Sequence, residues 1–305
     1  MKPTAKRLRL FGLLTLILTL VGTVGQFLAT HFGYDTLMGV YVQNNPLGPV
    51  VGWCLFVFVL LLVGLALLFP KETEVAPLPP CGNGLAFLSA TAGGVSVGAS
   101  VFMLLDVIKA TGPIKTLSIL LVILSLPAGI YLIRSATTRK TEDKLLSVLG
   151  FFPVLWLAVC LIRIYFDRTS AINDPVQLLL QLSLAAVMLY FLTELRSRVG
   201  KPGFRLRLAA GAAATLLGMA SSVSTILLYF GLGNGVDERS IGIRTVVTRG
   251  ELFLAVAELL MTLYSAGRLA ALIRAKGETA EDASAEETAE EAASVSDGKD
   301  ASEAL

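Results

Sequence analysis

Long apolar runs alternate with short polar segments along most of the chain. Eight of these runs are long enough to cross the hydrocarbon core of a bilayer, which takes about 20 residues of helix. In lipid only helices and closed barrels satisfy every backbone polar group, so we interpret each run as a helix. The predicted spans are residues 8–28, 49–69, 85–108, 114–134, 145–166, 175–195, 206–230 and 251–273. The predicted fold class is all-α, a polytopic membrane bundle of about eight transmembrane helices.

The pattern changes after the last apolar run. From Gly277 to Leu305 the sequence consists mainly of Ala, Glu, Ser, Thr and Asp, and almost no apolar side chain is larger than Ala. Such a segment cannot bury enough surface to offset its ordering entropy. We therefore predict a transmembrane domain over residues 1–276 and a disordered acidic tail over residues 277–305. A solvated charge run is the simpler interpretation of the tail, and a docking segment for a protein partner is the alternative.

Basic residues indicate the orientation, because cytoplasmic loops retain Lys and Arg. When the N-terminus is placed inside, most of the 25 Lys and Arg residues fall on the inner side. Both termini are therefore expected in the cytoplasm. The first run follows a basic stretch, as a signal peptide does, but its apolar part is longer than the usual signal-peptide core, so we expect an uncleaved anchor.

Composition supports the membrane interpretation and excludes most catalytic chemistry. The chain is 54% hydrophobic and 16% charged, which is more apolar surface than a soluble fold of 305 residues hides. Three separated cysteines and a single histidine, His31, argue against disulfide frameworks, zinc sites and histidine-dependent catalysis. The sequence contains no Walker A motif, dinucleotide fingerprint or GxSxG elbow. We expect no enzyme activity, no catalytic residues, no cofactor, no metal and no nucleic-acid partner.

Two of the predicted helices carry small residues at every fourth position. That spacing stacks the residues on one helical face, where they let a neighbouring backbone approach closely. The predicted packing ridges are Ala86, Ala90, Gly94 and Gly98 in the third helix, and Ala210, Ala214, Gly218 and Ser222 in the seventh. These two helices are our candidates for the centre of the bundle.

The same two helices are the third members of two successive sets of four. An Asx-Pro pair precedes the second helix of each set, at Asn45-Pro46 and at Asp174-Pro175, and both sets end on a basic residue. A duplication of this kind would give two parallel four-helix halves. The alternative is coincidence, because Asx-Pro at a helix start and Arg at a cytoplasmic end are common signals.

A few charged or amide side chains fall within or at the edge of the predicted spans, on the outer half of the membrane. Charged groups there are costly and usually face a bundle interior or a wet cavity. The candidates for a ligand or ion pathway are Glu258, Arg163, Asp106, Asp167, Gln177 and Gln181. One interpretation is an outward-facing polar pocket in which Glu258 or Asp106 pairs with Arg163. The other is that Asp106, Arg163 and Asp167 reach the interface while Glu258 makes one interhelical contact.

One stretch of the chain resembles a known group of proteins. Residues 151–157 (FFPVLWL), 163–167 (RIYFD) and 173–175 (NDP) form a pattern similar to that of uncharacterised bacterial multi-spanning membrane proteins. The resemblance covers the fifth and sixth predicted helices. It implies a protein of the bacterial cytoplasmic membrane and no particular activity or catalytic residues.

Two functional hypotheses follow from these patterns. The first is a transporter-like or solute-binding membrane protein with an outer polar pocket. The second is a non-catalytic membrane module that senses, scaffolds or assists another protein through its cytoplasmic loops and tail. The lipid bilayer is the partner expected in both hypotheses.

Overall fold

A computed structural model of the chain describes residues 5–35, 40–41, 46–70, 82–109, 112–137, 144–166, 174–201, 203–230 and 248–300. For residues 35, 40, 136–137 and 278–300 it describes the backbone alone. The described elements are α1 (Ala5–Gly33), β1 (Tyr34–Asp35), β2 (Val40–Tyr41), α2 (Leu47–Leu68), α3 (Asn83–Asp106), α4 (Pro113–Thr137), α5 (Lys144–Leu149), α6 (Phe151–Phe166), α7 (Pro175–Arg198), α8 (Phe204–Tyr229) and α9 (Arg249–Asp300).

The prediction of an all-α membrane bundle is confirmed. Within the described residues, eight helical segments are long and apolar enough to cross a membrane, and each contains or closely overlaps one of the predicted spans. The protein is thus a multi-pass membrane protein by the length and composition of its helices. The strands of its described part are β1 and β2, a short antiparallel pair in which Tyr34 is opposite Tyr41.

The fifth span is built from two helices, α5 and α6, rather than one. α5 ends at Leu149, Gly150 forms a turn, and α6 begins at Phe151. Pro153 explains the break, because it has no backbone N–H to donate to the carbonyl of Leu149 and its ring disfavours a continuous helix. By contrast, α4 continues through Pro127 to Thr137.

Side chains fix the beginnings of two helices. The Asp174 carboxylate caps α7 by accepting from the backbone N–H groups of Val176 and Gln177. At the start of α9, Thr248 and Glu251 form a reciprocal capping box, in which each backbone N–H donates to the other side chain. These bonds satisfy backbone donors that have no partner inside a helix.

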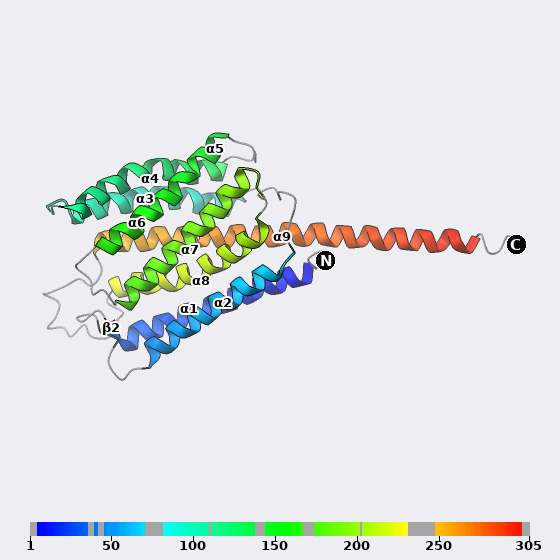
Figure 1. The fold of residues 1–305 in the computed structure, drawn as a ribbon, viewed down its shortest axis with the longest axis horizontal. Helices are drawn as coiled ribbons and strands as arrows, with labels where there is room; N and C mark the ends of the chain where they lie inside the picture. The colour runs from blue at the N-terminus through cyan, green and yellow to red at the C-terminus, as the bar shows by residue number, and fades with distance from the viewer. Residues whose placement is uncertain are drawn as a thin grey trace.

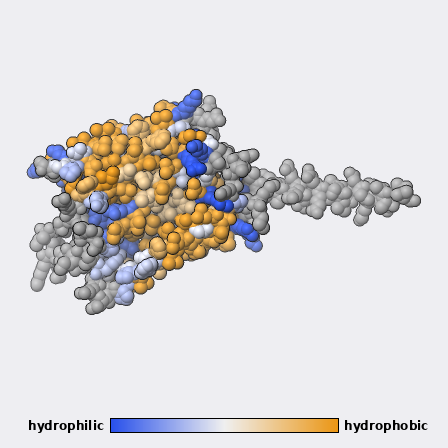
Figure 2. Space-filling view, viewed as in Figure 1, coloured by the Kyte–Doolittle hydropathy of each residue, from blue (hydrophilic) through white to orange (hydrophobic). Residues whose placement is uncertain are grey.

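The face of the bundle seen in Figure 2 is mainly apolar between two more polar ends. Large hydrophobic side chains are exposed along most of the helices, for example Leu16 on α1, Phe56 on α2 and Leu182 on α7. A continuous apolar surface of this extent is not stable in water and is expected where lipid covers the protein.

Helices α8 and α9 occupy the centre of the bundle (Figure 1). α8 packs against α7, α1 and α2, and α9 packs against α3 and α8. Apolar side chains from all eight spans form one core, which includes Leu216 of α8 and Met261 of α9. The start of α1 and the point where α9 leaves the bundle lie at the same end (Figure 1). We call this the basic end, because Lys6, Arg196 and Arg274 are exposed there.

The predicted small-residue ridge is a packing face in α8 and is not one in α3. In α8, Ala214, Gly218 and Ser222 are buried, and Gly218 lies directly against Thr262 of α9. In α3, a methyl group on Gly94 or Gly98 would meet no atom within 4 Å. The prediction for α3 was therefore wrong, and this helix is not the second central helix of the bundle.

The buried face of α3 lies beside the predicted ridge. Gly93 faces Gly129 of α4, so closely that a Cβ on Gly93 would come 2.8 Å from the Gly129 carbonyl oxygen. Ser89 donates to the carbonyl oxygen of Leu132 at 2.7 Å and lies 3.1 Å from the Ser135 hydroxyl oxygen. Small residues thus bring α3 and α4 together, as the spacing argument expected, but on a different face.

The proposed duplication is only partly reflected in the packing. The pairs α1–α2 and α6–α7 both pack together, as do α3–α4 and α8–α9. The counterparts α3 and α8 nevertheless have different surroundings, because α8 packs against α1, α2 and α7 whereas the main neighbours of α3 are α4 and α9. The two halves are thus not equivalent in their helix contacts.

The backbone of α9 continues as a helix beyond the bundle as far as Asp300 (Figure 1). The structure does not show the disordered tail that the composition of residues 277–305 predicts. That expectation stays a prediction, and residues 301–305 lie outside the described part of the chain.

Candidate functional site

Glu258 lies in the interior of the bundle, at the meeting point of its three central helices. Its carboxyl group belongs to α9, its exposed fraction is 1%, and it contacts Ser183 of α7 and Ser221 of α8. The helix rise places it about 13 Å along α9 from Arg249, near the middle of a span that is about 30 Å thick. The sequence-based expectation of a deep carboxyl group agrees with this position.

The hydrogen bonds around Glu258 fit a protonated carboxyl group. A serine hydroxyl carries one proton. The Ser183 hydroxyl lies 2.8 Å from the Leu180 carbonyl oxygen and also makes a short contact with Glu258 Oε1. When Ser183 donates to the carbonyl oxygen, Glu258 has to supply the proton of the second bond. Ser221 then donates to Glu258 Oε2 at 3.4 Å.

Among the residues that the structure describes, Glu258 has no opposite charge beside it. In the described part of the chain, no Lys, Arg or His side chain lies within ion-pair distance of its carboxyl oxygens. A carboxylate buried without a counter-ion is costly, so bundles usually pair such groups with a base. The absence of a described pair favours the protonated form of Glu258, which the hydrogen bonds permit.

Towards the basic end, a second buried carboxyl group has the opposite environment. Glu194 of α7 is fully buried and accepts hydrogen bonds from Tyr131 of α4 at 3.0 Å and from Tyr264 of α9 at 3.1 Å. Arg198 forms an ion pair with it at 2.9 Å, and Arg268 Nη2 lies 4.0 Å away. We call these five residues the Glu194 cluster.

Each arginine of the Glu194 cluster also holds one of the tyrosines. Arg198 Nε donates to the Tyr131 hydroxyl at 3.2 Å, and Arg268 Nε donates to the Tyr264 hydroxyl at 3.0 Å. Each guanidinium lies over the ring of the same tyrosine, at 5.5 and 5.4 Å from the ring centre. Each tyrosine hydroxyl therefore both donates and accepts a hydrogen bond. Through these bonds the Glu194 cluster connects α4, α7 and α9.

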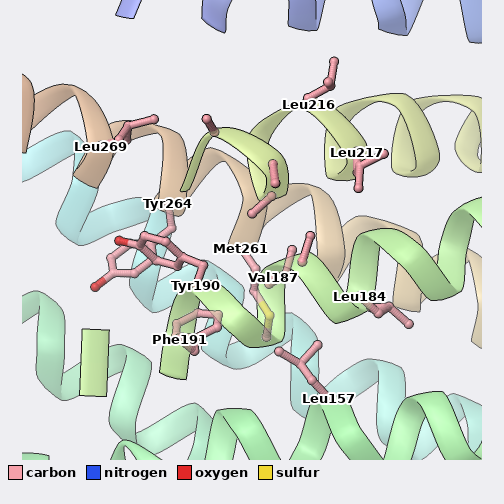
Figure 3. Close-up of a cluster of buried hydrophobic side chains, with 14 of the residues drawn as sticks. Leu157, Leu184, Val187, Tyr190, Phe191, Leu216, Leu217, Met261, Tyr264 and Leu269 are labelled. Atoms are coloured by element: carbon pink, nitrogen blue, oxygen red, sulfur yellow. The ribbon is translucent and has the colours of Figure 1, made fainter. Parts of the chain in front are cut away.

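Between the levels of Glu258 and Glu194 along the helices lies a layer of buried apolar side chains, several of which are drawn in Figure 3. The layer contains Leu184 and Val187 of α7, Leu217 of α8 and Met261 of α9, all of them buried. Ser183 and Glu194 lie on either side of it, about 16 Å apart along the axis of α7. The two carboxyl sites are thus separate in this conformation.

The other predicted pathway residues do not join Glu258. Arg163 is buried and donates from Nε to the Ser118 hydroxyl of α4 at 3.0 Å. Asp106 accepts from the backbone N–H of Gly250 at 2.9 Å and so helps to cap α9. The predicted pairing of Glu258 or Asp106 with Arg163 was wrong for the described residues, because none of these three forms an ion pair with another.

The predicted amides and Asp167 add no further link to Glu258. Gln177 donates from its side chain to the Ile164 carbonyl oxygen at 3.3 Å and so connects α7 to α6. Gln181 is half-buried on α7. Asp167 lies outside the described residues.

A small polar group at the other end of the bundle ties the β pair to the helices. Tyr34 donates to the Asp174 carboxylate at 3.0 Å, and Gln26 of α1 donates to the Tyr41 hydroxyl at 3.3 Å. Burial raises the pKa of Asp174 despite these hydrogen bonds, and it also raises the pKa of Tyr41. This group fixes the α1–α2 connection onto the start of α7.

Sequence reasoning missed the Glu194 cluster altogether. Glu194 and Arg198 lie four residues apart at the basic end of a span, which is typical of an exposed helical ion pair. The available signal was a Glu in the last turns of an otherwise apolar helix, with Tyr131 and Tyr264 near the corresponding ends of two other helices. Among the described residues, no group of three His, Cys, Asp or Glu side chains is arranged to hold a metal ion.

Comparisons with protein-family models, with curated proteins and with solved structures give no match for this chain, so the functional argument rests on Glu258, the Glu194 cluster and the layer between them.

Proposed function

We propose that the protein is a proton-linked membrane transporter in which Glu258 binds and releases the proton. The observation that carries this proposal is a single one: a fully buried carboxyl group near the middle of a membrane span, with no counter-ion among the described residues and with hydrogen bonds to serines of α7 and α8. Ionisable groups inside membrane spans are expensive, and in pumps and transporters they mark ion or proton pathways.

The surroundings of Glu258 support a role in conformational coupling. Ser183, Ser221 and Glu258 come from three helices, so the loss of the proton would leave a charge where those helices meet. A charge without a partner favours a conformation that brings water or a cation to it. Proton binding and helix arrangement are coupled in this way, as proton-linked transport requires.

The location that accompanies this function is a bacterial cytoplasmic membrane, with the basic end and both termini facing the cytoplasm. The distribution of Lys and Arg supports this orientation. The side chains Arg196, Lys201 and Arg274 are exposed at that end, on the same side as the start of α1.

The proposed function is tested in proteoliposomes that contain a trapped pH-sensitive dye. Groups of small solutes, such as amino acids, sugars, organic acids and inorganic cations, are added outside, and the internal pH is followed. We expect at least one solute group to change the internal pH with the wild-type protein and not with E258Q. E251Q, which changes a glutamate at the start of the same helix, should behave as the wild type does.

A response that is the same in the wild type and E258Q, or absent in both, would contradict a proton-linked transporter. The sensing or scaffolding hypothesis makes the reverse prediction, because there the loops and the tail carry the function. Deleting residues 278–305 separates the two: the transporter keeps its solute-dependent pH change, whereas a tail-dependent module loses its effect on the cell.

A further inference from the structure

Two buried hydroxyl groups in the core have no hydrogen-bond partner among the residues that the structure describes. They are the Thr262 hydroxyl of α9 and the Tyr190 hydroxyl of α7, and both side chains have an exposed fraction of 0%. A buried polar group that lacks a partner is destabilising, so native proteins keep few of them. Their positions therefore call for an explanation.

Along their helices, Thr262 and Tyr190 lie at positions between those of the two buried carboxyl residues. Thr262 follows Glu258 by one helical turn on α9, and Tyr190 precedes Glu194 by one turn on α7. The two helices run in the same direction, since Ser183 faces Glu258 and, further along, Glu194 faces Tyr264. From Glu258 towards the basic end, the order of these polar groups is thus Glu258, Thr262, Tyr190 and Glu194.

The surroundings of the two hydroxyls differ. Thr262 packs against Gly218 of α8, where the missing side chain gives it room. The charged and titratable groups that act on the Tyr190 hydroxyl are Glu194, Tyr264, Arg268 and Arg207. Figure 3 shows the rings of Tyr190 and Tyr264 with their hydroxyl oxygens pointing away from the apolar layer. Tyr190 thus belongs to the Glu194 side and Thr262 to the Glu258 side.

We infer that Thr262 and Tyr190 are relay groups of a proton path from Glu258 to the Glu194 cluster. The inference rests on the proposed function, which it deepens by assigning the route towards the basic end. Water that enters between the two hydroxyls would complete the chain, since polar groups of this kind are normally satisfied by buried water. In the conformation described here the apolar layer interrupts the chain, which prevents a leak.

The transfer conserves protons and involves no oxidation. Glu258 gives one proton to water hydrogen-bonded to Thr262, each hydroxyl passes on one proton while it receives another, and Tyr190 delivers one proton to the Glu194 carboxylate or its water. Arg198 and Arg268 stabilise the Glu194 carboxylate, so Glu194 does not retain the proton and releases it at the basic end. Glu258 is left as a carboxylate until it is protonated again.

The test is the rate at which the Glu258 proton exchanges with deuterium. Infrared spectra of the full-length protein in liposomes are recorded after a change from H₂O to D₂O, and the carbonyl band of the protonated Glu258 is identified by its loss in E258Q. We expect Y190F and T262V each to lower the rate at which this band shifts after the change to D₂O by about tenfold or more. An effect of this size is typical when a proton-transfer group is removed. The band itself should remain in both variants.

The controls separate a relay from a general loss of structure. T262S keeps the hydroxyl and should exchange at the wild-type rate. T19V removes another buried hydroxyl without a partner, in α1, and should also exchange at that rate. Wild-type exchange in Y190F or in T262V would overturn the path, while the proposed function would stand. The absence of an exchangeable Glu258 band in the wild type would instead overturn the proposed function.

Discussion

At the scale of single residues, two buried carboxyl groups in neighbouring helices have opposite environments. Glu194 is held by two arginines and two tyrosines, whereas in the described part of the chain the polar contacts of Glu258 are with the hydroxyls of Ser183 and Ser221. The first arrangement stabilises the charged form of Glu194 and fixes side chains of three helices through hydrogen bonds and an ion pair. The second suits a group that changes its protonation state. Glu194 is therefore expected to matter for stability as well as for release of the proton, and Glu258 for binding the proton.

The stability role of the Glu194 cluster predicts a large effect for R198Q. Removal of one guanidinium leaves the buried Glu194 with Arg268 at 4.0 Å as its remaining described cation, and breaking a buried pair typically costs about 3 kcal/mol or more. R196Q changes an exposed arginine two positions earlier on α7 and should have little effect. Thermal unfolding in detergent compares the two variants. Equal unfolding temperatures would show that the ion pair does not stabilise the bundle.

At the scale of elements, the α3–α4 contact shows why the ridge prediction failed in one helix and succeeded in another. Each step of four residues advances by about 40° around a helix, so a long series of such steps drifts away from any single contact face. In α8 the drift does not matter, because neighbours surround the helix and all of Ala214, Gly218 and Ser222 are buried. In α3 only one face meets protein, and that face contains Ser89 and Gly93.

This contact predicts opposite effects for two adjacent glycines. In G93A the new methyl group would approach the Gly129 carbonyl oxygen at 2.8 Å, and overpacking of this kind should destabilise the protein by about 1–3 kcal/mol. In G94A the methyl group meets nothing within 4 Å, and the better helix propensity of alanine should stabilise it by up to about 1 kcal/mol. Unfolding temperatures measured side by side check both signs. A stabilising G93A would disprove the close contact between α3 and α4.

At the scale of the whole molecule, the even number of described spans places the start of α1 and the exit of α9 at the same end. The basic side chains gather at this end as well, which favours its location in the cytoplasm. The path of the chain brings the two helix ends to one side of the bundle, and the charge distribution predicts which side of the membrane that is.

This orientation predicts the behaviour of reporter fusions in bacteria. A fluorescent protein that matures only in the cytoplasm should be fluorescent when it is fused to either terminus. A reporter enzyme that is active only outside the cytoplasm should be inactive at both positions. Activity of the outside reporter at either terminus would contradict the orientation, and opposite results at the two ends would contradict the even number of spans.

The sequence by itself determined the class of the molecule and the positions of its spans, because each apolar run has to satisfy its own backbone in lipid and needs no other part of the chain to do so. It also singled out Glu258, since a carboxyl group in an apolar run is conspicuous. Only the tertiary structure decided which groups meet: that Arg163 binds Ser118, that Asp106 caps α9, and that Glu194 lies among residues of three helices. The physical reason is that side chains project from all sides of a helix. Which helix packs against each side is decided by contacts between segments far apart in the chain.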